Sequence, residues 1–114
     1  MKLPHANQAR AGREKFTEYL LNRSHPDGKN KAEFFTRFGF DVERWELLAN
    51  AMVRHAVRHD VVRTVESAHG TRYAVDGPLE CPDGRHPLVR SVWLIEKGSR
   101  VPRLITAYPL EEGS

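Results

Sequence analysis

The spacing of apolar residues changes from a helical to a strand-like period near residue 60, and this change constrains the fold more than any other feature. Before it, apolar side chains recur three and four positions apart, as on one face of a helix. After it, β-branched and aromatic residues dominate segments that are separated by Gly, Pro and Asp. A helical first half followed by a sheet predicts an α+β fold.

Three segments of the first half have helical spacing. We expect a short helix at residues 13–22, because Phe16, Tyr19 and Leu20 fall on one face. We expect a second at residues 31–40, ended by Gly39, because Phe34, Phe35 and Phe38 do the same. The third segment begins at Asp41, a good N-cap, and should run to about His59. Its apolar stripe consists of Val42, Trp45, Leu48, Ala49, Met52, Val53 and Ala56.

The second half contains four strand-like segments, "VVRTVES", "TRYAVDGPL", "PLVRSVWLIE" and "RLITAYPL". The segments between them are short enough for consecutive hairpins, which predicts a four-stranded antiparallel meander with the three helices packed on one face. The other face can stay open to water and to a ligand. Alternation separates Arg90 from Trp93 in the third strand. In the fourth strand it predicts that Leu104, Thr106 and Tyr108 share a face.

Length and composition limit the class of protein. The 114 residues should form one domain, with helices over about residues 13–59 and the sheet over about residues 60–110. A net charge of +3 is too small to establish nucleic-acid binding. The single cysteine, Cys81, cannot form an intramolecular disulfide, and no apolar run approaches the ~18 residues of a membrane span. We therefore expect a soluble, cytoplasmic protein with no membrane partner.

The stretch "SHPDGKNKAEFF" joins a turn to the start of a helix. Pro26 and Gly28 suit a type I turn, so a well-made turn and cap would explain that part of the motif. It gives no reason for His25, Lys29 and Lys31 to gather where a helix begins. The free N–H groups and the dipole already make this end positive, so two lysines would add to an anion site. Both interpretations stay open.

Arg90 is a second candidate because it lies within the apolar strand "VRSVWLI". An arginine there is costly unless it is paired or faces a wet groove, so it is either a structural ion pair or an anion ligand. Thr106 and Tyr108 alone are ordinary strand residues. His55 and His59 have the spacing of zinc ligands, but no glutamate completes an H-E-x-x-H motif.

Several common catalytic signatures are missing from the sequence. It contains no P-loop, no G-x-G-x-x-G, no G-x-S-x-G and no paired-carboxylate motif. These absences disfavour nucleotide hydrolysis, dinucleotide redox chemistry and serine hydrolysis. We therefore expect neither a metal site nor a cofactor.

A set of motifs resembles a bacterial domain family of unassigned function. They are "KLPHANQA", the block "YLLNRSHPDGKNKAEFF" with "GF" four residues later, "RYAVDGPL", "VRSVWLI" and "PRLITAYP", and they span almost the whole chain. The family is found at the C-termini of polymorphic and contact-dependent toxins and as stand-alone small proteins. The resemblance implies that residues 1–114 form a single toxin-like domain, controlled by a small antitoxin or immunity protein.

The order of helices and meander, closing on T-A-Y-P, is also similar to the barnase, EndoU, colicin and RelE superfamily of metal-independent ribonucleases. This looser resemblance implies cleavage of RNA, with tRNA among the candidates, by attack of the ribose 2′-OH on the adjacent phosphate. Such an enzyme needs a base, cationic phosphate stabilisation and an acid for the leaving oxygen. Barnase-like enzymes generally use a strand Glu or His pair, and Glu66, Asp76 and His86 match no such motif.

The resemblance allows roles to be suggested for six residues. His25 would act as base or acid, since its ordinary pKa lies near neutrality. The phosphate would be held by Lys29, Lys31 and Arg90. Thr106 would orient the phosphate, and Tyr108 would stack on a base or donate a proton. The alternative is a non-catalytic protein- or RNA-binding module of a two-gene toxin–antitoxin or immunity system.

Overall fold

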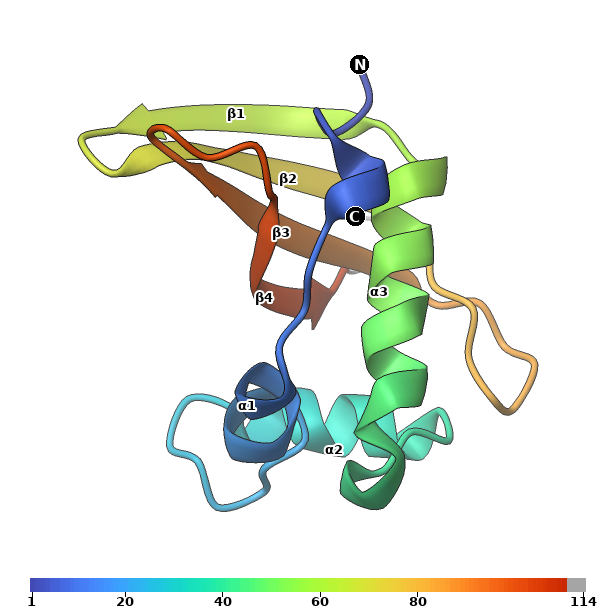
Figure 1. Ribbon diagram of the computed structural model, residues 1–114. Helices are drawn as coiled ribbons and strands as arrows, with labels where there is room; N and C mark the ends of the chain where they lie inside the picture. Colours follow the sequence, from blue (N-terminus) through green and yellow to red (C-terminus); the bar gives the residue numbers. More distant parts are fainter. Residues whose placement is uncertain (111–114) are drawn as a thin grey trace.

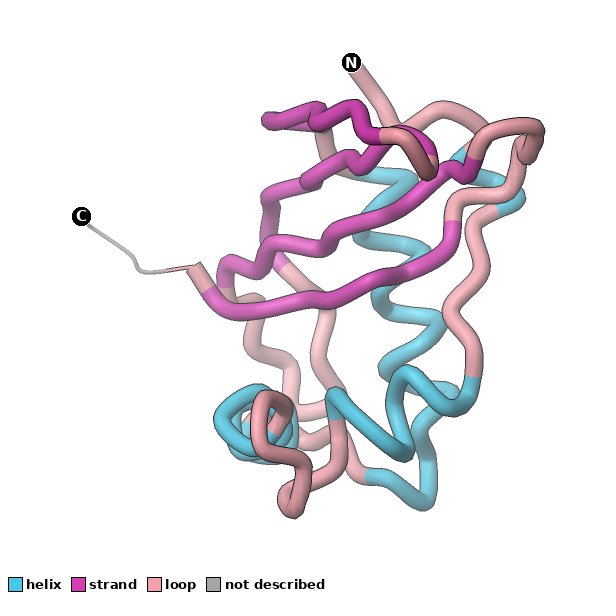
Figure 2. Tube along the Cα trace, turned by 90° about the vertical axis from the view of Figure 1, so that its left-hand side faces the viewer, coloured by secondary structure: helices cyan, strands magenta, loops and turns pink. Residues whose placement is uncertain are grey.

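Four antiparallel strands form a meander in the order β1-β2-β3-β4, and the helices lie on one side of it (Figures 1 and 2). The structure is a computed structural model that describes residues 1–110. It confirms the expected α+β fold, with helices first and sheet second. In chain order the elements are η1 (Ala6–Gln8), α1 (Arg13–Lys15), η2 (Phe16–Leu20), α2 (Lys29–Arg37), η3 (Val42–Arg44), α3 (Trp45–Arg58), β1 (Val61–Ser67), β2 (Gly70–Pro78), β3 (Leu88–Glu96) and β4 (Arg103–Pro109).

The third strand follows the predicted alternation. Val89, Ser91 and Trp93 are fully buried on the face that the helices cover. Arg90 points to the uncovered face and is only partly buried. The sheet therefore has one dry face and one face that solvent can reach.

The fourth strand departs from simple alternation because it contains a bulge. Relative to β3, β4 has one extra residue, Ile105, at the point where the pairing shifts. Leu104 is consequently buried against the helices, whereas Tyr108 pairs with Arg90 on the other face. Thr106 and Tyr108 share a face as predicted, opposite Val92 and Arg90. The prediction was wrong for Leu104, because the inserted residue puts it on the other face.

The first helix occupies the predicted place but is irregular. After the single turn of α1, the chain continues as a π-helix, η2, in which the N–H of Leu21 donates to the carbonyl of Phe16 at 2.8 Å. Phe16 and Leu20 are fully buried, and Tyr19 between them is half-buried. The π-helix thus anchors its ends in the core and leaves Tyr19 at the boundary with solvent.

The other two helices lie close to their predicted positions. Helix α2 begins at Lys29, two residues early, and ends at Arg37, because Gly39 adopts a left-handed φ of 103°. Asp41 caps η3 as expected, accepting the N–H of Arg44 at 3.0 Å, and α3 follows directly. The longest helix, α3, has 14 residues, and within residues 1–110 no helix has both the length and the apolar character to cross a membrane.

The core lies between the helices and the covered face of the sheet. Its largest side chains come from η2, α2, α3, β2 and β3 and from the loop after α2. Burial of each contributes roughly 1.5–3 kcal/mol. They include Phe16, Leu20, Phe35, Phe40, Leu48, Met52, Val75, Val89 and Trp93.

The first ten residues reach both edges of the sheet, which the sequence pattern did not indicate. The carbonyl of Met1 accepts the N–H of Val61 at the start of β1, at 2.7 Å. Further along, the N–H of Arg10 donates to the carbonyl of Pro102 at 2.8 Å, and the carbonyl of Arg10 accepts the N–H of Leu104 at 2.9 Å. These bonds form a short parallel bridge beside β4. This segment therefore has a fixed place in the fold.

Candidate functional site

The hydroxyl of Tyr19 is the point where three elements meet. The Nζ of Lys31, from α2, donates a hydrogen bond to it at 2.8 Å. The Oγ1 of Thr106, from β4, lies 3.0 Å from it on the other side. Two residues that the sequence analysis singled out are thus brought together, through a tyrosine that it had assigned only to the apolar face of the first helix.

The surroundings of Tyr19 favour its ionised form. Two half-buried lysines lie over its ring, with the Nζ of Lys15 at 5.4 Å and the Nζ of Lys31 at 5.1 Å from the centroid. Burial alone would raise the pKa of Tyr19. The hydrogen bonds from Lys31 and Thr106, together with the charges of Lys31 and Lys15, outweigh it and lower the pKa. A tyrosine of this kind can exchange a proton more readily than an isolated one.

His25 packs against Tyr19 and also caps its own turn. The two rings meet edge to face, with centroids 5.0 Å apart. The Nδ1 of His25 accepts the N–H groups of Asp27 at 3.0 Å and Gly28 at 2.9 Å. Because Nδ1 is an acceptor, the neutral ring carries its proton on Nε2. The cap therefore explains one nitrogen of His25 and leaves the other as a hydrogen-bond donor.

Gly28 is required by close packing. A β-carbon at this position would lie 2.3 Å from the carbonyl oxygen of Tyr19, although the backbone of Gly28 is in the ordinary right-handed region. The turn therefore packs directly against the backbone of the π-helix.

We call Tyr19, His25, Lys31 and Thr106 the Tyr19 cluster.

Lys29 lies next to this cluster but makes fewer contacts. It is exposed at the first residue of α2, and its backbone N–H donates to the carbonyl of His25 at 3.0 Å. Within residues 1–110, its side chain forms no ion pair or hydrogen bond. Its charge is thus available beside the N-terminus of α2, without a fixed position.

Arg90 forms an ion pair on the uncovered face of the sheet. Asp76, Arg90 and Tyr108 lie side by side on β2, β3 and β4. The guanidinium donates to the two carboxylate oxygens of Asp76 at 2.7 and 2.9 Å, and interaction with Asp76 first and Tyr108 second raises the pKa of Arg90. Of the two alternatives left open by the sequence, this geometry shows the ion pair.

The Arg90 group, defined as Asp76, Arg90 and Tyr108, is separate from the Tyr19 cluster. In the described part of the chain no hydrogen bond or ion pair joins the two sets. Their link is β4, on which Thr106 and Tyr108 stand two residues apart. Arg90 and Tyr108 also border a hollow of about 170 Å³ on the open face, so their side chains can be reached from solvent.

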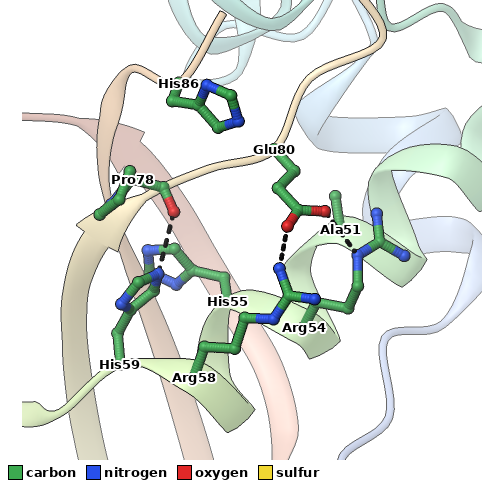
Figure 3. Close-up of a pocket in the computed structure, with 8 residues that line it drawn as sticks. All are labelled: Ala51, Arg54, His55, Arg58, His59, Pro78, Glu80 and His86. Carbon is green, nitrogen blue, oxygen red and sulfur yellow. Dashed lines mark hydrogen bonds and ion pairs between the residues drawn. The ribbon is translucent and has the colours of Figure 1, made fainter. Parts of the chain in front are cut away.

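A pocket of about 140 Å³ at the C-terminal end of α3 contains the two histidines with zinc-like spacing (Figure 3). Arg54 and Arg58 both point to the carboxylate of Glu80, in ion pairs that are about half exposed. Such exposed pairs contribute about 0–1 kcal/mol each. The arginines of this pocket are therefore already satisfied by an internal carboxylate.

His55 has a structural role beneath that pocket. Its Nε2 lies 3.0 Å from the carbonyls of Gly77 and Val89, so this nitrogen donates, while Nδ1 lies 2.9 Å from the Oγ of Ser91. The same Oγ accepts the indole N–H of Trp93 at 2.8 Å. Both ring nitrogens of His55 are thus engaged in a buried network that ties α3 to β2 and β3, which leaves none for a metal.

This network makes stability depend on pH. Burial is the largest effect on the pKa of His55 and lowers it below 6.5, its ordinary value. The unfolded chain therefore takes up this proton before the folded protein does. The stabilising contribution is complete above about pH 6.5 and is lost as the pH falls, by up to about 1.4 kcal/mol per pH unit. Urea unfolding between pH 7.5 and 5 should show this decline, and a constant free energy of unfolding would contradict it.

A family model described as a domain of unknown function (DUF6883) matches residues 2–111. No curated protein matches the chain in sequence. Among solved structures, the chain is similar to one in a contact-dependent growth inhibition toxin–immunity protein complex from Klebsiella pneumoniae 342. The TM-score is 0.70 at 18% identity, and the alignment covers 93% of this chain and 97% of the other. This likeness establishes a shared fold.

Proposed function

The chain belongs to the DUF6883 family of domains of unknown function, and we propose that it is a metal-independent, endoribonuclease-like toxin domain. In this proposal it cleaves RNA through attack of the ribose 2′-OH on the adjacent phosphate. One observation carries it. The Tyr19 hydroxyl, with its lowered pKa, lies between Lys31 and Thr106, so a group that can exchange a proton is in contact with a cation and a hydroxyl.

The Tyr19 cluster supplies the acid and the cationic phosphate stabilisation that this reaction needs. The proton of the attacking 2′-OH would pass to a water molecule, because the neutral ring of His25 already carries a proton on Nε2. Lys31, with Lys29 beside it, would hold the phosphate and offset the charge that builds up in the pentacoordinate transition state. Tyr19 would give its proton to the departing 5′-oxygen, and Thr106 would orient the phosphate. The Nε2–H of His25 takes no part in the turn's hydrogen bonds and would donate to a second phosphate oxygen.

Arg90 and Tyr108 would act on the neighbouring part of the RNA. Asp76 holds the guanidinium of Arg90 through hydrogen bonds from Nε and Nη2, so the N–H groups of Nη1 can still bind a phosphate. Tyr108 would stack on a base. In this arrangement Asp76 is a positioning residue, since it acts through Arg90.

A small immunity protein or antitoxin is the proposed protein partner. The similar solved chain belongs to a toxin–immunity protein complex, which supports this class of partner for a domain of the same fold. RNA in the cytoplasm, with tRNA among the candidates, is the proposed substrate. A partner that covers the Tyr19 cluster or the Arg90 group would block the reaction.

The direct test is RNA cleavage without metal. The purified domain, incubated with total RNA and with tRNA in EDTA, should produce fragments that end in 2′,3′-cyclic phosphate. Expression of the wild type should slow growth, while the variants H25A and R90A should be less harmful. Intact RNA in EDTA, with wild type and variants equally harmless, would overturn the proposal.

The engagement of Arg90 by Asp76 and of His25 by its turn favours one alternative, a non-catalytic module that binds protein or RNA. Such a module would leave growth unaffected on induction. The variant R90A would then change complex formation alone. Growth after induction thus separates the two functions before any RNA is analysed.

A further inference from the structure

A groove of about 500 Å³ runs between the chain that leads into α1 and the start of β4. Its volume falls within the range of about 300–1,000 Å³ that is usual for ligand sites. We call it the N-terminal groove. Its walls include Arg10, Glu14, Lys15, Val101 and Arg103.

The walls of the N-terminal groove are held by main-chain hydrogen bonds. Arg10 is fixed to β4 through its own N–H and carbonyl, which bond to Pro102 and Leu104. The Arg10 side chain takes no part in these bonds and is exposed. The groove is therefore preformed, and a substitution that shortens this side chain leaves its wall in place.

Some charged side chains of the groove are paired with each other, and others form no ion pair. Arg103 is paired with Glu96 at 2.7 Å, which neutralises one charge of each sign. Arg10 and Lys15 remain as cations, and Glu14 remains as an acid. Within residues 1–110 none of these three forms an ion pair. The groove thus offers two free cations for a polyanion, with one carboxylate that opposes it.

Lys15 connects this groove to the Tyr19 cluster. The same Nζ that lies 5.4 Å from the Tyr19 ring belongs to a residue that lines the groove. A chain of phosphates held by Lys31 could therefore continue past Lys15 to Arg10, with Glu14 as the unpaired acid along the groove. A single-stranded polyanion fits this continuity better than a compact anion does.

We propose that the N-terminal groove binds a nucleotide of single-stranded RNA that flanks the bond to be cleaved, with its phosphate held by Arg10 and Lys15. This inference rests on the proposed function, because it takes the Tyr19 cluster as the place of cleavage. Val101 provides apolar surface for the base or sugar. Glu14 limits the affinity by repelling the phosphates.

Binding of a 2′-O-methyl RNA 12-mer with a fluorescent label tests the groove apart from catalysis, because this oligonucleotide lacks the 2′-OH nucleophile. Anisotropy would be followed from 50 to 200 mM salt. The variant R10A should bind about 5- to 10-fold more weakly at low salt, with a salt slope smaller by about 0.7. The variant E14Q should bind more tightly, and K15A should resemble R10A.

The control is K2A, which removes an equal charge beside β1, at the opposite edge of the sheet, where Lys2 pairs with Asp60. It should leave binding unchanged. Equal losses of RNA affinity in R10A and K2A, or no loss in R10A, would contradict the proposal that this groove binds RNA. If the protein bound RNA through Arg10 but never cleaved it, the endoribonuclease proposal would be wrong and the proposal that the groove binds RNA would stand.

Discussion

Replacing Tyr19 with phenylalanine is expected to lower the rate of RNA cleavage by about 10²-fold or more, the usual contribution of a positioned general acid. The substitution removes the hydroxyl that contacts Lys31 and Thr106 and keeps the ring that packs against His25. Folding should therefore change little. Single-turnover cleavage of a defined RNA, with thermal unfolding measured in parallel, gives both quantities.

The pH dependence identifies the role of the hydroxyl. As a general acid, Tyr19 must be protonated, so wild-type activity should fall as the pH rises through a pKa below 10. The variant Y19F should lack this decline or show it at higher pH. Tyr73 on β2 is the matched control, because within residues 1–110 its hydroxyl forms no hydrogen bond. If Y73F and Y19F lost activity equally, the assignment of Tyr19 would be wrong.

Replacing His55 with alanine should destabilise the protein by roughly 3–5 kcal/mol, because it leaves a cavity and several buried polar groups without partners. The carbonyls of Gly77 and Val89 lose the N–H of His55, and the hydroxyl of Ser91 loses its acceptor, although its oxygen keeps the indole N–H of Trp93. For a domain of this size, the midpoint of thermal unfolding should fall by about 10–20 °C. Calorimetry or urea unfolding followed by tryptophan fluorescence measures the change.

His59 provides the comparison for His55. It follows one turn later, just past the end of α3, and is only half-buried. Its side chain makes one hydrogen bond, to the carbonyl of Pro78 at 3.1 Å. The variant H59A should cost about 1 kcal/mol or less. Equal losses in H55A and H59A would show that the buried network does not hold α3 to the sheet.

Most of the fold could be predicted because its signals are local. Strand boundaries follow β-branched residues and turns, and Asp41 and Gly39 mark helix ends through their own backbone chemistry. The N-terminal segment could not be predicted, since Arg10 is held by backbone groups of β4 that are distant in sequence. The same is true of the π-helix, whose hydrogen bonds differ from those of an α-helix by one residue.

The candidate site was predicted in part. Lys31 and Thr106 both contact the hydroxyl of Tyr19, and Arg90 has an ion-pair partner, Asp76. Tyr19 was missed because a tyrosine at helical spacing with Phe16 is most simply read as core. The available signal was its polar tip, which requires a hydrogen-bond partner wherever the ring is partly buried. Only tertiary contacts show that a lysine and a threonine are the hydrogen-bond partners of this hydroxyl.

The extra residue in β4 has a consequence for comparing this chain with others. Ile105 reverses the side on which the last residues of the strand emerge, and this reversal sets Tyr108 beside Arg90 while Leu104 stays in the core. A relative with the same residues in this strand but regular pairing with β3, and the same leucine in the core, would direct its tyrosine inward. The pairing of this strand with β3 is therefore a better guide to shared chemistry than identity of the motif.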